Sequence, residues 1–367
     1  PKSIFTRGRN YKMELESTLP GLPLLACAAL LYRRTTHKRS MADARNYQYS
    51  PSQHSHRLAA DGTKQFRTPD EVVWGKVKGN HVSTVGEGSA TIQSRYAETS
   101  EFNVKHESSI SQESTLDIYY QQSRAVTVAE GNGDIIVYIH GGYWQALDKK
   151  SSCWHAERFL QSDNCSAFVA IGYDLCPTVS FPTLVQQVKS GVAHVLRTFP
   201  KHRIHVVGHS AGGHLGAEVL LTDWAKEYHI ATHKPVGYCL VSGVYDLRPI
   251  CKSYVNDACQ MSMAEALEFS PQLRSMNALK TLVGRRSTTS GGRDATPLRI
   301  IVAVGEHDSP AFRQQSQDFY KLLKENTSAV MTYVEMSGED HFTSIERLDD
   351  KTYVLSESIR MNLLCGV

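Results

Sequence analysis

The 367-residue chain has no C-x-x-C pair and no Cys/His spacing typical of a metal site, although it contains eight cysteines. Because the cysteines are scattered, we expect no disulfide framework, and unpaired thiols are typical of a reducing compartment. Basic residues do not cluster beside aromatic ones, and the formal net charge is only +3. The sequence therefore gives no support to a metal centre or to nucleic-acid binding.

No apolar run reaches the roughly 20 residues that a membrane-spanning helix needs. Segment 19–34 has an apolar part of about 14 residues that contains two prolines. Basic residues precede it, so a signal-peptide core is the alternative interpretation. We favour residues 1–40 as a tail or upstream segment without a fold, because Met41 opens a polar stretch that suits a chain start. We accordingly expect a cytoplasmic location, with the nucleus open as a second one, and no membrane role.

From residue 114 onward, short runs rich in β-branched residues alternate with helical patterns. In the longest pattern, residues 182–199, apolar side chains recur on one face with a period of 3.6. Strands this apolar are buried on both sides, so we expect an α/β fold with a doubly wound, mostly parallel sheet covered by helices on both faces. After the first run, at 114–120, the expected strands lie in the runs 134–140, 166–174, 203–210, 236–246, 298–308 and 330–342.

The composition divides the chain into three parts. Residues 41–115 are polar and are expected to form an N-terminal arm with one or two short helices. Residues 116–367 are expected to form a single α/β domain, because no internal repeat is visible. Within it, residues 283–297 are rich in Ser, Thr, Gly and Arg and predict a surface loop.

The sharpest motif is the pentapeptide from Gly208 to Gly212, which reads G-H-S-A-G. An apolar strand leads into it and a helical pattern follows at once. This is the setting of a nucleophile elbow, where small flanking residues allow a strained turn that exposes the Ser210 hydroxyl. The pattern predicts Ser210 as a catalytic nucleophile.

A serine hydroxyl becomes a good nucleophile when a histidine takes its proton and an acid orients that histidine. On this fold the chain order is Ser, then Asp or Glu, then His, each at a strand end. Asp308 closes the run 298–308, and His341 follows the next apolar run. We therefore expect Ser210, Asp308 and His341 to form a catalytic triad.

Other residues compete for these roles. Asp246 closes the run 236–246 and is the alternative acid, although we favour Asp308. Glu306 and Asp340 are expected to be solvated or supporting, because side chains one or two positions from the chosen residues point elsewhere. Three histidines are not assigned as the base, because two flank the nucleophile and the third precedes any available acid: His209, His214 and His307.

The segment 139–145, IHGGYWQ, leaves an apolar strand through two glycines. Acyl transfer puts negative charge on a carbonyl oxygen, and each preorganised backbone N–H there is worth roughly 3–4 kcal/mol in the transition state. One donor is expected from Ala211, which follows the nucleophile, and another from a loop after an early strand. Gly141, Gly142 and Tyr143 are the candidates, and the sequence leaves the choice among them open.

The pattern His-Gly-Gly-x-Trp, here His140 to Trp144, stands beside the segments GHSAGGHL, LVSGVYDL, SPQL, HDSPAFRQQSQDFY and DHF. With these features the chain resembles arylformamidases, also called kynurenine formamidases, over about residues 46–364. The resemblance implies an α/β-hydrolase fold without metal or organic cofactor. It also implies hydrolysis of N-formyl-L-kynurenine to L-kynurenine and formate, a step of tryptophan catabolism.

Several alternatives stay open at this stage. Tyr143, Trp144 and Tyr173 are candidates to face the aromatic ring of the substrate, and each is equally well explained as core packing. A broader carboxylesterase of the HGG type would share the triad and the oxyanion loop. A non-catalytic ligand-binding protein on the same fold is a second alternative, although such proteins typically lose the serine or the histidine. The sequence does not decide between a monomer and a homodimer.

Overall fold

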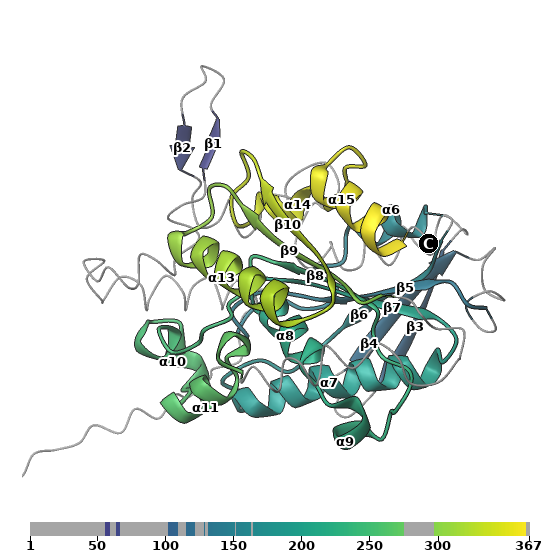
Figure 1. Cartoon of the computed structure of the whole chain (residues 1–367), viewed down its shortest axis with the longest axis horizontal. Coiled ribbons are helices and arrows are strands. Elements are labelled where there is room, and N and C mark those ends of the chain that lie inside the picture. The colour runs from purple at the N-terminus through teal and green to yellow at the C-terminus, as the bar shows by residue number, and fades with distance from the viewer. Residues whose placement is uncertain are drawn as a thin grey trace, which may run out of the picture.

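The computed structural model describes residues 56–58, 64–66, 102–108, 115–121, 128, 131–150, 152–162, 164–274 and 297–364. Within these ranges the chain forms an eight-stranded sheet with the order β10-β9-β8-β7-β5-β6-β4-β3 (Figure 1). The strands are β3 (Phe102–Ser108), β4 (Thr115–Gln121), β5 (Asp134–Ile139), β6 (Cys165–Ile171), β7 (Arg203–His209), β8 (Gly237–Val241), β9 (Arg299–Gly305) and β10 (Val330–Met336).

The sheet is parallel from β6 through β5, β7, β8 and β9 to β10. Only β4 and β3 join it antiparallel among the described strands. All parallel strands therefore end at one edge of the sheet, where loops from distant parts of the sequence meet. The prediction of a doubly wound, mostly parallel α/β sheet is confirmed.

The sheet separates two cores, and the side chains of a strand alternate between them, as β5 shows. In β5, Ile135, Val137 and Ile139 point into one core, whereas Ile136 and Tyr138 point into the other. The first core is covered by α7 (Phe181–Thr198), α8 (Ala211–Leu220), α9 (Trp224–Tyr228) and α13 (Pro310–Asn326). The second is covered by α6 (Ala156–Leu160), α14 (Thr343–Glu346), η5 (Arg347–Asp349), α15 (Val354–Ile359) and η6 (Arg360–Leu364) (Figure 1).

Helix α7 shows why the helical prediction for 182–199 is confirmed. The Ser180 hydroxyl accepts a hydrogen bond from the Thr183 N–H, and Pro182 occupies the first turn, where its missing N–H costs nothing. The apolar face is buried as the 3.6 period requires.

Four shorter helices connect β8 to residue 274, namely η3 (Ile250–Lys252), α10 (Asn256–Cys259), α11 (Met263–Glu268) and η4 (Pro271–Leu273).

The sheet begins before the expected domain boundary at residue 116. Strand β3 lies in the segment 41–115, which the composition assigned to an arm, and it pairs antiparallel with β4. The sequence FNVKHES has only two apolar residues in alternation, so it does not stand out as a buried strand. Two short strands, β1 (His56–Leu58) and β2 (Lys64–Phe66), form a separate hairpin.

Other N-terminal expectations lie outside the described residues. These are the tail 1–40, the short helices of the arm and nearly all of the loop 283–297. Within the described ranges, every helix is too short or too polar to span a bilayer.

Candidate active site

Ser210 lies in a sharp turn between the last residue of β7 and the first residue of α8. Its φ of 56° falls in the left-handed region, which costs a non-glycine residue on the order of 1–3 kcal/mol. The turn closes because the flanking positions have no side chain: a β-carbon at Gly208 would collide with the Gly212 carbonyl, and one at Gly212 with the Ile139 carbonyl. The Ser210 N–H donates to the Val241 carbonyl at 2.9 Å. This geometry matches the predicted elbow.

The loop after β5 passes directly beside this turn. A β-carbon at Gly141 would lie 3.2 Å from the β-carbon of Ser210. Gly142 has a φ of 102°, and a β-carbon there would collide with the Ala146 carbonyl. The glycines therefore bring main chain, rather than side chains, up to the nucleophile, as an oxyanion loop requires.

His140 and Tyr173 fix the start of this loop. Their rings stack with centroids 4.2 Å apart and an interplanar angle of 8°. The Tyr173 hydroxyl donates to the His140 carbonyl at 2.9 Å, and the His140 Nδ1–H donates to the Gly141 carbonyl at 2.9 Å. Burial lowers the pKa of His140 to about 4, so its imidazole is neutral at pH 7. The loop is thus held by a buried, uncharged pair of rings.

Asp308 and His341 form a buried pair. The Nδ1 of His341 lies 2.9 Å from Oδ2 of Asp308, and both residues are 3% exposed. The other carboxylate oxygen, Oδ1, accepts the Ser309 N–H at 2.6 Å. With Nδ1 engaged by the carboxylate, Nε2 of His341 remains for proton transfer. The structure thus brings together the predicted acid and base.

The competing acid is in a different environment. Strand β8 ends at Val241, before Asp246, and the Asp246 carboxylate pairs with Arg248 at 2.7 Å. The Arg248 side chain is 47% exposed. Asp246 therefore has a partner at the surface, whereas Asp308 faces His341.

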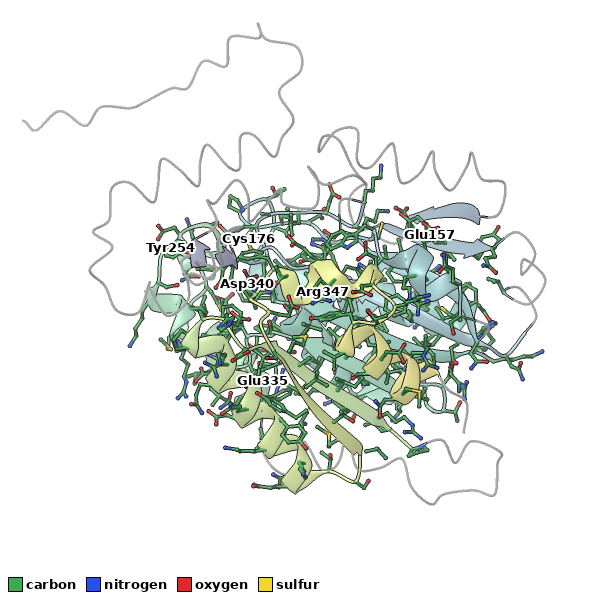
Figure 2. The ribbon with its side chains drawn as sticks, turned by 90° about the horizontal axis from the view of Figure 1, so that it is seen from above. Glu157, Cys176, Tyr254, Glu335, Asp340 and Arg347 are labelled. Atoms are coloured by element: carbon green, nitrogen blue, oxygen red, sulfur yellow. The ribbon has the colours of Figure 1, made fainter. Side chains whose placement is uncertain are left out.

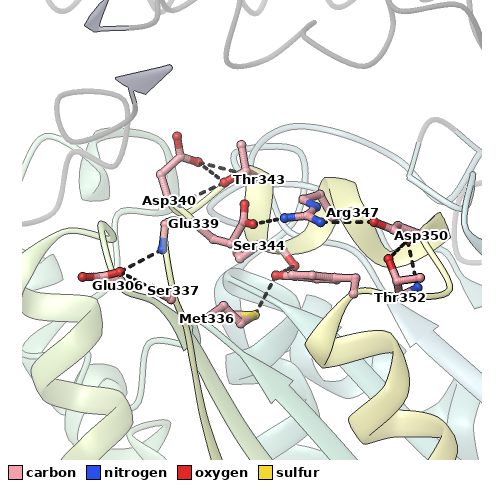
Figure 3. A network of polar contacts seen from close by, with 12 residues as sticks. Glu306, Met336, Ser337, Glu339, Asp340, Thr343, Ser344, Arg347, Asp350 and Thr352 are labelled. Atoms are coloured by element: carbon pink, nitrogen blue, oxygen red, sulfur yellow. Dashed lines mark hydrogen bonds and ion pairs between the residues drawn. The ribbon is translucent and has the colours of Figure 1, made fainter. Parts of the chain in front are cut away.

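Figure 3 shows the network of polar contacts that holds the loop containing His341. Oδ1 of Asp340 accepts the Phe342 and Thr343 N–H groups at 2.8 and 2.9 Å, which fixes the turn around His341. Glu306 accepts from the Ser337 hydroxyl at 2.9 Å and from the N–H of the next residue. Both carboxylates are therefore supporting residues, as expected.

Arg347, which follows the His341 loop in sequence, holds this loop through a second set of contacts. Arg347 pairs with Glu339 and, at 3.1 Å, with Asp350, and its guanidinium lies 4.8 Å from the centre of the Tyr353 ring. Figure 2 shows the segment of Arg347 lying across the sheet when the molecule is seen from above. The tyrosine hydroxyl donates to the Ser344 carbonyl at 3.0 Å. These contacts hold the chain after β10 on the second core.

His209, His214 and His307, which were not assigned as the base, each donate a hydrogen bond to a main-chain carbonyl. His214 is fully buried in α8 and donates through Nε2 to the Phe269 carbonyl at 2.8 Å. Burial lowers its pKa. The main-chain N–H of His307 donates to the Glu339 carbonyl at 2.8 Å. His209 donates through Nε2 to the carbonyl of His341 at 2.8 Å.

The three aromatic candidates lie in different surroundings. Trp144 is fully buried, with its ring 5.1 Å from that of Phe181, so it packs in the core. Tyr173 is also buried and holds the loop through its hydroxyl. Tyr143 is half-buried, and its ring lies 6.2 Å from that of Phe312.

Sequence reasoning missed Phe312. Its ring lies 4.6 Å from the imidazole of His341, on the first turn of α13. One sequence signal indicates Phe312: it lies four residues after Asp308, in the first turn of the helix that follows the predicted acid. Among the described residues, no cluster of three or more His, Cys, Asp or Glu side chains is arranged to hold a metal ion.

A strained serine turn, an Asp–His pair and a glycine loop that presents main chain are the groups that acyl transfer through a serine requires. A family model described as alpha/beta hydrolase fold matches residues 136–344. Two solved structures share this fold. They are carboxyl esterase 2 of Tuber melanosporum (TM-score 0.54, 20% identity, 70% of this chain and 84% of that one) and an esterase of Rhizomucor miehei (TM-score 0.52, 16% identity, 82% and 94%).

The similarity to curated relatives extends over most of the chain. The kynurenine formamidase of Salmo salar is 34% identical over 311 residues, which cover 84% of this chain and 92% of the relative. That of Danio rerio is 34% identical over 316 residues, which cover 86% and 94%. That of Drosophila melanogaster is 24% identical, covering 64% and 74%.

Proposed function

The chain belongs to the kynurenine formamidase family of α/β hydrolases, and we propose from this premise that it hydrolyses N-formyl-L-kynurenine to L-kynurenine and formate. The relatives' names support the substrate, because the chain matches nearly their whole length. The 2.9 Å contact of His341 with Asp308 is the observation that supports the reaction type, and the His341 carbonyl accepts a hydrogen bond at 2.8 Å from His209, the neighbour of Ser210. In this proposal the bond cleaved is the C–N bond between the formyl carbonyl and the aryl amine.

In the proposed first step, Ser210 Oγ attacks the formyl carbon while Nε2 of His341 takes the hydroxyl proton. Asp308 keeps the imidazole in the tautomer that leaves Nε2 free, and it stabilises the imidazolium that forms. The negative charge on the formyl oxygen is met by the Ala211 N–H and by amides of the loop at Gly141, where main chain approaches the serine. The choice among the loop amides of Gly141, Gly142 and Tyr143 stays a prediction.

The tetrahedral intermediate then collapses. The C–N bond breaks, and His341 passes its proton to the departing aryl amine, which leaves as L-kynurenine. Water attacks the formyl ester on Ser210 while His341 takes a proton from it. The C–O bond to Ser210 then breaks, formate leaves, and His341 returns the proton to Ser210 Oγ. The half-buried ring of Tyr143 is our candidate to face the aryl group, because Trp144 and Tyr173 are occupied by packing and by the loop.

The test is formate release from N-formyl-L-kynurenine by the purified chain, with S210A as the matched variant. We expect S210A to lower turnover by on the order of 10⁶-fold, because the covalent route is lost, while its circular dichroism and melting temperature stay those of the wild type. Turnover of short p-nitrophenyl esters is measured beside it. Ester turnover that exceeds formamide turnover by orders of magnitude would instead support a carboxylesterase.

We also propose a cytoplasmic location. The cysteines that the structure describes are free thiols, as is typical of a reducing compartment. A nuclear pool and a homodimer stay predictions, which fractionation of cells and light scattering of the purified chain would test.

A further inference from the structure

His209 is the last residue of β7 and directly precedes the nucleophile. It is only 7% exposed. Burial, followed by the nearby His341, lowers its pKa well below that of a free histidine, so it is neutral at pH 7. A buried polar ring is costly unless it has a hydrogen-bond partner, so we expect the partner of His209 to be a specific group nearby.

That partner is the main chain of the catalytic histidine. His209 Nε2–H donates to the His341 carbonyl at 2.8 Å, and the two rings lie 4.7 Å apart. Strands β8 and β9 separate β7 from β10 in the sheet, so no backbone ladder joins the serine turn to the loop after β10. The His209 side chain bridges this distance.

The other side of His209 faces the oxyanion loop. A β-carbon at Gly141 would lie 3.0 Å from the His209 carbonyl oxygen and 3.3 Å from its Nδ1. Gly141 thus packs against the residue that holds the His341 loop. The loop after β5 and the loop after β10 therefore both contact His209, which is the last residue of β7.

His209 is not a second base. Its Nε2–H is committed to a carbonyl, and a charged ring beside His341 would oppose the imidazolium that forms there during catalysis. A neutral donor with a fixed tautomer fits a structural tie.

We infer that His209 is a positioning residue that fixes the His341 loop and the Gly141 loop relative to Ser210. This inference rests on the proposed serine mechanism and deepens it. Its removal is expected to displace the base rather than to weaken substrate binding, so the effect falls on kcat and leaves KM nearly unchanged.

The experiment compares H209L, which removes the donor, with H209Q, whose amide N–H can replace Nε2–H. We expect H209L to lower kcat about 100-fold, the usual effect of a misplacement near 1 Å, and H209Q to recover most of it. The matched control is H205L, because His205 lies on the same strand, is 3% exposed and bonds Asp134 at 2.8 Å far from the site. H205L is expected to lower the melting temperature and keep kcat.

A second readout separates this inference from the proposed function. A fluorophosphonate reacts with the serine by forming a P–O bond and releasing fluoride, whatever the natural substrate is. If the wild type releases no formate but H209L still slows this labelling relative to H205L, the formamidase proposal fails and the positioning role stands. Labelling and kcat of H209L equal to the wild type, or an equal loss in H205L, would overturn the positioning role.

Discussion

Asp308 and Asp246 are residues of the same type with different contacts. Asp308 is buried against His341, whereas Asp246 pairs with the exposed Arg248. We expect D308N to lower kcat/KM for formate release on the order of 10⁴-fold, because the amide favours the wrong imidazole tautomer. D246N should stay within about fivefold, since exposed ion pairs contribute about 1 kcal/mol or less. Steady-state kinetics of both variants decides, and the reverse order would refute the assignment of the acid.

The residues of the site could be predicted where a motif and the chain order converge. Ser210 and His341 follow from the elbow and from strand ends. The contact of His209 with His341 could not be read in advance, because the two residues are 132 positions apart and only the fold brings them together. Trp144 is a related case, since its burial against Phe181 is set by α7 and not by its own segment.

At the scale of elements, the loop after β5 is defined by close approach of its backbone. G141A places a β-carbon 3.0 Å from the His209 carbonyl and 3.2 Å from the Ser210 β-carbon, so the loop must shift. We expect kcat to fall about 100-fold with the fold retained. The control is G191A in α7, where the new β-carbon meets only the flexible side chain of Ile171 at 3.3 Å and alanine favours the helix. Kinetics and melting temperatures of both variants test this, and a fully active G141A would contradict it.

The strands of the parallel sheet were predictable as elements because burial on both faces requires continuous apolar runs. Their ends were less predictable. Run 236–246 has apolar residues as far as Tyr245, with Ser242 and Gly243 between them, yet β8 ends at Val241. It ends there because Ser242 takes a φ of 48°, which is not an extended conformation. Strand β3 was missed because its edge position does not require such a run.

At the scale of the molecule, the buried neutral histidines make the free energy of unfolding depend on pH. The pKa of His140 falls to about 4, and those of His209 and His214 are also lowered. The unfolded chain therefore binds more protons between pH 6.5 and about 4. The stabilisation is complete above pH 6.5 and is lost as pH falls toward 4, about 3 kcal/mol for His140 alone.

Urea unfolding at pH 7.5 and pH 5 measures this loss. The free energy of unfolding should be lower at pH 5, and H214Q, which removes one titrating group, should reduce the difference. Equal free energies at the two pH values in the wild type would contradict the prediction.

Strand β10 lies at the edge of the sheet, with β9 as its neighbour and Val330 41% exposed, and His341 follows it closely. Ser210 follows β7, which has a neighbouring strand on both sides, whereas His341 follows the edge strand. We therefore expect the segment of His341 to have the lower local stability. A local opening of β10 would separate the base from the nucleophile while the central sheet stays intact. We accordingly expect local opening of this edge, ahead of unfolding of the central sheet, to limit the lifetime of the active enzyme.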